Sequence, residues 1–315
     1  MDSKTIILLV LGLILLLVSG KYLVESSVVI ARHFRIPTGI IGLTIVAFGT
    51  SAPELLVSLQ AAVQGHPDMA VGNVVGSNIS NILLVLGLTT VIFPLVVQSE
   101  SVKRDWPIMI GLSILLLLIL LDYQISRLEG GLLILLLGGY ILFSIYQSRK
   151  PQLNIPPVDV PLRKMKWGVA AIIFAISCIG LAFGASLLVD NAAEMAHYFG
   201  ISERVISITM VALGTSLPEL STSLIAAFKK ETDISLGNII GSNIMNIVSV
   251  LGLTALIKPF SIVPELLTID IPWMIGASVL LFLFMIPARK GRINRLEGSL
   301  LFLAYAIYIY FIFIG

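Results

Sequence analysis

The chain alternates long apolar runs with short polar stretches, a pattern typical of a protein that crosses a membrane several times. Ten runs are long enough to form spanning helices, and they lie at about 5–31, 38–64, 69–93, 106–122, 128–147, 166–197, 203–229, 234–257, 267–287 and 295–314. We expect the second helix to be interrupted at Gly49 and Pro53. The predicted fold class is therefore an all-α membrane protein with ten transmembrane helices.

The composition supports this interpretation. Of the 315 residues, 57% are hydrophobic and 12% are charged, whereas a soluble domain carries roughly 25% charged residues. The first apolar run follows Lys4 as a signal peptide would, but no small-residue cleavage site closes it, so it is interpreted as a membrane helix. Cys178 is the single cysteine and cannot form an internal disulfide.

Two sequence blocks occur twice at a constant offset of 165 residues. The stretch 49–54 reads GTSAPE and 214–219 reads GTSLPE, while 72–81 reads GNVVGSNISN and 237–246 reads GNIIGSNIMN. One offset over both blocks indicates a duplicated unit. The sequence thus predicts a first five-helix repeat at 1–147, a linker at 148–165 and a second repeat at 166–315.

Five helices is an odd number, so the two repeats must be inserted in opposite orientations. Placing the N-terminus outside puts fifteen of the twenty basic residues in inside loops: Arg32, Arg35, Lys103, Arg104, Arg149, Lys150, Arg163, Lys164, Lys166, Lys229, Lys230, Arg289, Lys290, Arg292 and Arg295. Inside loops carry an excess of Lys and Arg. We therefore expect both termini to be extracellular, the linker to be cytoplasmic and the protein to lie in the plasma membrane.

Each repeated motif places one carboxylate, Glu54 or Glu219, inside an apolar run, where an ionisable group is costly and usually functional. Pro53 and Pro218 each remove the backbone hydrogen bond to the carbonyl four residues earlier, which frees oxygen ligands near the motif. Thr50 lies four residues before Glu54, so the hydroxyl and the carboxylate share one helix face. The second repeat has the same spacing.

The second block adds hydroxyls and amides to this set. Ser77 and Asn81 are four residues apart, as are Ser242 and Asn246, so each helix presents both groups on one face. Two carboxylates with hydroxyl, amide and carbonyl oxygens suit hard cations such as Ca²⁺ and Na⁺. One Ca²⁺ or two Na⁺ would neutralise the two carboxylates, and an empty site would favour protonation. Exchange at a midplane site between inverted repeats follows as a hypothesis.

These motifs, their spacing and the inverted duplication resemble the sodium/calcium exchanger family of the cation/calcium antiporter superfamily, in its prokaryotic form without a regulatory domain. The resemblance implies that Glu54 and Glu219 are the central Ca²⁺ ligands, shared with Na⁺ and aided by the carbonyls of Thr50 and Thr215. It further implies an inner Na⁺ site lined by Ala47, Thr50, Ser51 and Ser77, and an outer one lined by Ala212, Thr215, Ser216 and Ser242. Asn81 and Asn246 would flank the centre. Helices one and six resemble a pair that slides across the core.

The sequence leaves alternatives open. A Ca²⁺/H⁺ exchanger on the same scaffold would use Glu54 and Glu219 as proton carriers, although the neighbouring hydroxyls favour Na⁺. A cation channel is disfavoured by the inverted repeats, and no motif of a metalloenzyme occurs. Some potassium-dependent relatives carry Asp where this chain has Asn246, which weakens a K⁺-coupled interpretation. We expect inorganic cations and the lipid bilayer as partners, with no cofactor, nucleic acid or obligatory protein partner.

Overall fold

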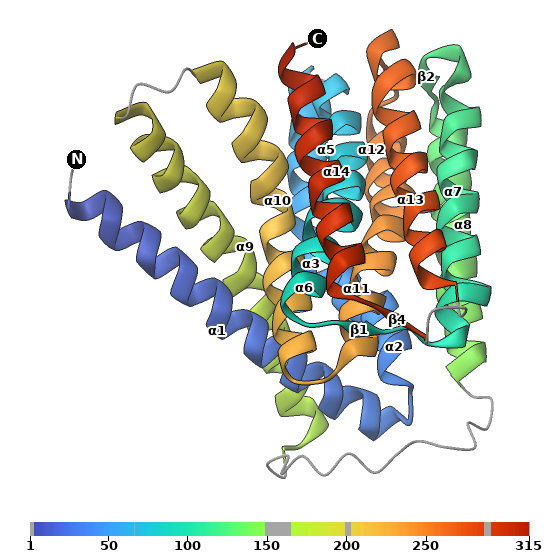
Figure 1. Ribbon diagram of the computed structural model, residues 1–315. Coiled ribbons are helices and arrows are strands. Elements are labelled where there is room, and N and C mark those ends of the chain that lie inside the picture. The colour runs from blue at the N-terminus through green and yellow to red at the C-terminus, as the bar shows by residue number, and fades with distance from the viewer. Residues whose placement is uncertain (1–2, 66, 149–164, 199–202, 287–290, 315) are drawn as a thin grey trace.

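A computed structural model describes residues 3–65, 67–148, 165–198, 203–286 and 291–314, with the side chains of 203–213 among those left undescribed. The structure is mostly helical (Figure 1). Its first half contains α1 Ser3–Phe34, α2 Thr38–Ile41, η1 Gly42–Val46, α3 Ala47–Thr50, α4 Ala52–Gln64, α5 Pro67–Ser80, η2 Asn81–Leu86, α6 Gly87–Ile92, β1 Leu95–Val96, η3 Ser101–Asp105, α7 Trp106–Ile119, η4 Leu120–Asp122, β2 Gln124–Ile125 and α8 Arg127–Ser148.

The second half repeats this order with fewer breaks. It contains α9 Trp167–Tyr198, α10 Glu203–Phe228, α11 Thr232–Met245, η5 Asn246–Leu251, α12 Gly252–Ile257, β3 Phe260–Ser261, η6 Leu266–Asp270, α13 Ile271–Met285, β4 Arg292–Ile293 and α14 Arg295–Ile314. Segments η1, η2, η3, η5 and η6 are π-helical, a wider winding that is frequent at functional sites.

Eight helices among the described residues are long and apolar enough to cross a membrane. Helices Thr38–Thr50 and Ala52–Gln64 form a pair bent by 43°, which would make nine spans if the pair counts as one. This bend confirms the predicted interruption of the second helix. Helix α10 is the remaining run that the sequence predicts as a span, so the count of ten stays a prediction.

Two short antiparallel ribbons, which the sequence pattern did not predict, join the halves of the chain. Strand β1 pairs with β4, with Leu95 opposite Ile293, and β2 pairs with β3, with Gln124 opposite Ser261. In Figure 1 the β1–β4 ribbon lies at the lower end of the helices and β2 at the upper end. Each ribbon therefore links the first half to the second at a different end of the molecule.

Burial is concentrated in two continuous helical segments, one from each half. The segments Met69–Ile92 and Thr232–Ile257 are 78% and 89% buried over their apolar windows, whereas the other six spans are 22–33% buried. Helix α11 lies close to α2 and η1, since a Cβ on Gly237 would lie 2.7 Å from the Gly39 carbonyl oxygen and one on Gly241 would lie 2.5 Å from that of Leu43.

Helices α1 and α9 pack along each other and lean away from the other helices toward the upper end in Figure 1. Glycines allow this contact, because a Cβ on Gly12 would lie 2.8 Å from the Leu188 nitrogen. Two polar contacts add to the packing between α1 and α10, one of them through the residue that follows α10. The Ser221 hydroxyl donates to the Leu16 carbonyl oxygen at 2.8 Å, and Lys229 forms a 2.5 Å ion pair with Glu25. The pair α1–α9 is thus anchored to the core mainly through α10.

Candidate ion-binding site

The first GTSAPE motif forms a bend within a helical segment. Helix α3 ends at Thr50, Ser51 adopts φ −83° and ψ 7°, and α4 begins at Ala52 with Pro53 in its first turn. Proline has no N–H to donate, which leaves the Gly49 carbonyl without its usual helical partner. In the second copy, α10 remains one helix with Pro218 inside it. The two copies therefore differ in backbone shape although their sequences match.

The two motif carboxylates lie fully buried and close enough for their charges to interact. Glu219 accepts hydrogen bonds on Oε1 from the hydroxyls of Ser51, at 3.2 Å, and Ser242, at 3.3 Å. Neither oxygen of Glu54, nor Oε2 of Glu219, has a hydrogen-bond partner within the described part of the chain. A buried polar atom without a partner costs about 1–3 kcal/mol. These three oxygens are therefore suited to binding a cation.

Hydroxyl groups of each half meet polar groups of the other half around these carboxylates. The Thr50 hydroxyl donates to Asn238 Oδ1 at 3.1 Å and lies 3.4 Å from the Ser242 hydroxyl. The Ser77 hydroxyl lies 3.2 Å from that of Thr215. Each of these hydroxyl pairs joins one residue expected at the inner Na⁺ site, Thr50 or Ser77, to one expected at the outer site, Ser242 or Thr215. The packing between the halves decides this arrangement.

The predicted amides lie at the start of the two π-helical segments. Asn81 opens η2 and Asn246 opens η5, and both are fully buried. Asn246 donates through Nδ2 to Asn78 Oδ1 at 3.1 Å, whereas its own Oδ1 and both amide atoms of Asn81 have no hydrogen-bond partner among the described residues. Each predicted asparagine therefore presents an oxygen that a cation could use.

Each half has one further asparagine whose amide binds the backbone of the motif glutamate. Asn73 donates to the Ser58 hydroxyl at 2.9 Å and to the Glu54 carbonyl oxygen at 3.3 Å. The equivalent contacts of Asn238 reach Ser223 at 3.0 Å and the Glu219 carbonyl oxygen at 3.5 Å. Neither asparagine is among the ligands that the sequence predicts. Their signal was the constant offset of 165 residues, which relates Asn73 to Asn238.

Ala47, Ser216 and Ala212 complete the predicted set. The Ala47 carbonyl oxygen accepts from the Ser51 nitrogen at 2.9 Å and lies 3.2 Å from the Thr50 hydroxyl, whose single hydrogen can instead go to Asn238 Oδ1. The Ser216 hydroxyl is buried, with no hydrogen-bond partner among the described residues. Ala212 lies in α10, but its side chain is outside the described part of the structure.

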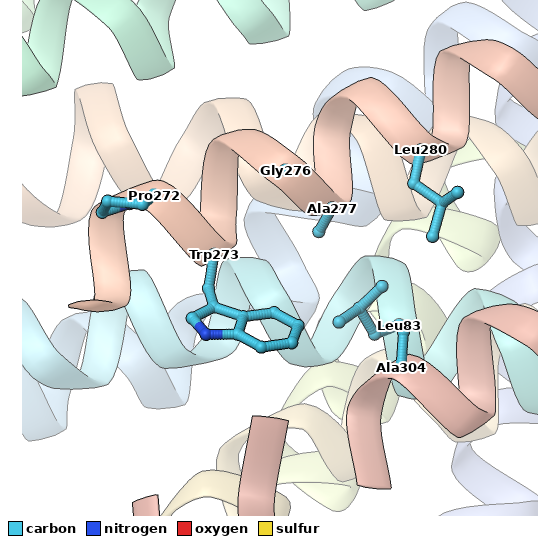
Figure 2. A pocket seen from close by; sticks show the side chains of 7 residues that line it. All are labelled: Leu83, Pro272, Trp273, Gly276, Ala277, Leu280 and Ala304. Atoms are coloured by element: carbon cyan, nitrogen blue, oxygen red, sulfur yellow. The ribbon is translucent and has the colours of Figure 1, made fainter. Parts of the chain in front are cut away.

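An apolar groove lies elsewhere on the molecule and does not take part in this site. It has a volume of about 420 Å³ and lies between α13, α14 and η2 (Figure 2). Its lining consists of Leu83, Pro272, Trp273, Gly276, Ala277, Leu280 and Ala304. Without a carboxylate, hydroxyl or amide in this lining, the groove offers a cation no side-chain oxygen. Nor do the described residues hold a group of three or more His, Cys, Asp or Glu side chains that could bind a metal.

The chain is similar to known proteins in both sequence and overall fold. The family profile described as "Sodium/calcium exchanger protein" matches residues 4–146 and 169–314. Inner membrane protein YrbG of Escherichia coli (strain K12) is 39% identical over 93% of this chain and 92% of its own length. Sodium/calcium exchanger MaX1 of Methanosarcina acetivorans is 32% identical over 99% of both chains. A solved structure of the sodium-calcium exchanger NCX_Mj, soaked with Na⁺ and Sr²⁺, has a TM-score of 0.83 at 33% identity and covers 98% of this chain and 99% of that one.

The fold and the site define a helical membrane protein with a buried, oxygen-lined polar centre to which both halves of the chain contribute. Proteins of this class carry inorganic cations across the membrane. The chain belongs to the sodium/calcium exchanger family, since the family profile matches nearly its whole length. It is accordingly an antiporter and not an enzyme.

Proposed function

We propose that this protein exchanges Na⁺ for Ca²⁺ at a site centred on Glu54 and Glu219. The observation that carries the proposal is the pair of fully buried carboxylates, three of whose four oxygens accept no hydrogen bond from described residues. When both are ionised, their charge of −2 is matched by one Ca²⁺ or by two Na⁺. A site that holds either set of ions, but not both at once, meets the physical requirement for exchange.

The proposed ligands are oxygens, which hard cations prefer. Glu54 and Glu219 provide the charge, and the remaining members are Thr50, Thr215, Ser51, Ser216, Ser77, Ser242, Asn81, Asn246, Ala47 and Ala212. The described contacts support two clusters. One contains Glu219, Ser51, Ser242 and Thr50, and the other contains Ser77 and Thr215. A cation entering the first cluster would replace the weak hydroxyl contacts to Glu219 with direct coordination.

We further propose that alternating access relies on two inverted five-helix repeats, 1–147 and 166–315, with ten spanning helices in total. The matched contacts of Asn73 and Asn238 and the two ribbons at different ends of the molecule support this symmetry. The family profile also matches in two stretches, one within each proposed repeat. Inverted repeats around a midplane site are a known architecture for alternating access.

We propose that the protein lies in the plasma membrane. In the proposed orientation both termini are outside the cell and the linker 148–165 is in the cytoplasm. Apart from its two ends, this linker lies outside the described residues. In Figure 1, α8 ends and α9 begins at the lower end, while α14 ends at the upper end. The lower end would therefore be cytoplasmic, which agrees with the excess of basic residues in those loops.

Radioactive Ca²⁺ uptake into sealed proteoliposomes tests the coupling ion. Vesicles loaded with Na⁺ are diluted into Na⁺-free medium, and matched vesicles carry an outward proton gradient instead. We expect the Na⁺ gradient to drive uptake and Glu54→Gln to abolish it. If neither the Na⁺ gradient nor the proton gradient drove Ca²⁺ uptake, the proposal would be refuted.

A Ca²⁺/H⁺ exchange is the second candidate, favoured by the two oxygens of Glu54 that accept no hydrogen bond from described residues, because a proton can neutralise such a carboxylate as a cation does. Protons could then compete with Na⁺ at Glu54 and Glu219. In the same vesicles, uptake driven only by the proton gradient would replace Na⁺ by H⁺ as the coupling ion and leave the two-glutamate site in place.

A further inference from the structure

A groove lies where the end of α1 meets the start of α9, at the lower end of these helices in Figure 1. Its volume is about 630 Å³, and its lining includes His33, Met165, Lys166, Trp167, Val169 and Ile172. None of these residues takes part in the proposed ion site. Because His33 belongs to α1 and the other lining residues lie in α9 or just before it, a molecule in the groove would contact both helices.

The groove combines basic and aromatic side chains at its mouth. The His33 ring stacks on the Trp167 ring at 5.6 Å between centroids, and the Phe34 ring meets Trp167 edge-on at 5.7 Å. Lys166 is exposed beside them, and the lining contains no acidic side chain. Tryptophan is enriched where membrane meets water. The mouth thus offers an anion two nitrogen-bearing side chains at the depth of lipid head groups.

An apolar surface leads away from this mouth along α9. Val169, Ile172, Ile176, Ile179 and Phe183 follow one another at spacings of three or four residues, so they share one face of the helix. Their exposed fractions run from 48% to 70%. In a membrane-spanning helix such a face contacts lipid. The groove therefore continues into a surface that an acyl chain can follow.

We propose that this groove binds an anionic membrane phospholipid. Lys166 and His33 contact its phosphate head group, and Trp167, Val169 and Ile172 contact the glycerol region and the beginning of an acyl chain. The charge of the lining selects the anionic lipid over a zwitterionic one, and the apolar face selects a lipid over a free phosphate. Basic pockets between membrane helices bind anionic head groups in this way. The proposal does not depend on which cation the protein exchanges.

Quenching of Trp167 fluorescence by brominated lipids tests the proposal on the intact, purified chain in nanodiscs. The protein has three tryptophans, so the signal of Trp167 is obtained as the difference between the parent and Trp167→Phe. Brominated phosphatidylglycerol is compared with brominated phosphatidylcholine at equal mole fractions. We expect half-maximal quenching at a lower fraction of phosphatidylglycerol. A basic side chain at a membrane surface contributes about fivefold to such a preference, so Lys166→Gln should reduce it about fivefold.

Three controls make the result decisive. Lys103→Gln makes the same charge change on an exposed residue of η3 and should leave the preference unchanged. His33→Gln provides a second test of the groove, and it should also lower the preference. Free glycerophosphate should not displace the brominated lipid. Equal quenching by both lipids, an equal loss in Lys103→Gln, or displacement by glycerophosphate would each overturn the proposal, whatever the outcome of the transport assay.

Discussion

Replacing Glu54 with glutamine changes charge and almost nothing else, which makes it a sharp test of the proposed site. The substitution keeps the size of the side chain. Because neither carboxylate oxygen of Glu54 accepts a hydrogen bond from described residues, no described hydrogen bond of this side chain is lost. The negative charge of the site is halved, from −2 to −1. One Na⁺ would then neutralise the site, whereas Ca²⁺ would leave a net positive charge in a buried environment.

The expected loss follows from the cost of leaving a buried charge uncompensated. Removing one partner from a buried charge arrangement costs about 3–5 kcal/mol, which corresponds to about 10²–10⁴-fold weaker Ca²⁺ binding because each 1.36 kcal/mol is tenfold. The assay is Na⁺-driven Ca²⁺ uptake in proteoliposomes, together with the thermal unfolding temperature of the purified protein. We expect uptake to be lost and the unfolding temperature to be unchanged or higher.

Glu265→Gln is the matched control, because it makes the same chemical change on an exposed residue outside the site. It should transport Ca²⁺ like the parent. Glu219→Gln should lose transport as Glu54→Gln does. If Glu54→Gln transported Ca²⁺ within about threefold of the parent, which corresponds to less than about 0.7 kcal/mol, the charge argument would be refuted.

Three further predictions concern packing, charge and the ends of the helices. Gly241→Ala should lower the unfolding temperature and destabilise the protein by about 1–3 kcal/mol, since its Cβ would lie 2.5 Å from a backbone oxygen; Gly138→Ala, with nothing within 4 Å, should not. Asn246→Asp adds a third buried carboxylate and should alter the dependence of Ca²⁺ uptake on pH or K⁺; identical pH and K⁺ titrations for variant and parent would count against a role of Asn246 in the site. Lys229→Gln breaks the partly exposed ion pair with Glu25 and should lower the free energy of unfolding by up to about 1 kcal/mol; an equal loss on top of Glu25→Gln would show that the pair is not responsible.

Local features of this protein followed from the sequence because their causes are local. The apolar runs predicted the spanning segments, since a lipid environment forces each backbone polar group to bond within its own helix. Pro53 predicted the break near Ser51, because proline cannot donate the helical hydrogen bond. The constant offset of 165 residues was enough to identify the motifs and both glutamates. Burial of Glu54 and Glu219 agrees with that selection.

Contacts between helices could not be predicted in the same way, because they depend on how each helix is rotated and shifted against its neighbours. Periodicity shows that Ser77 and Asn81 share a face but not that Ser77 meets Thr215. The role of Asn73 in holding Glu54 required two helices to come together. Helix α10 is continuous although it contains Pro218, whereas the matching motif with Pro53 bends, so the motif's own sequence does not fix its backbone shape.

The sequence by itself determined the class of protein, the membrane segments, the repeated motifs and the oxygen-bearing residue types suited to Na⁺ and Ca²⁺. The tertiary structure alone decided which hydroxyls surround Glu219, that Glu54 accepts no hydrogen bond from the described residues, and that a groove with basic and aromatic walls lies between α1 and α9. The physical reason is one of range. Hydrophobicity and backbone hydrogen bonding act within a helix, whereas a site exists only where the close packing of several helices brings distant residues to within a few ångströms.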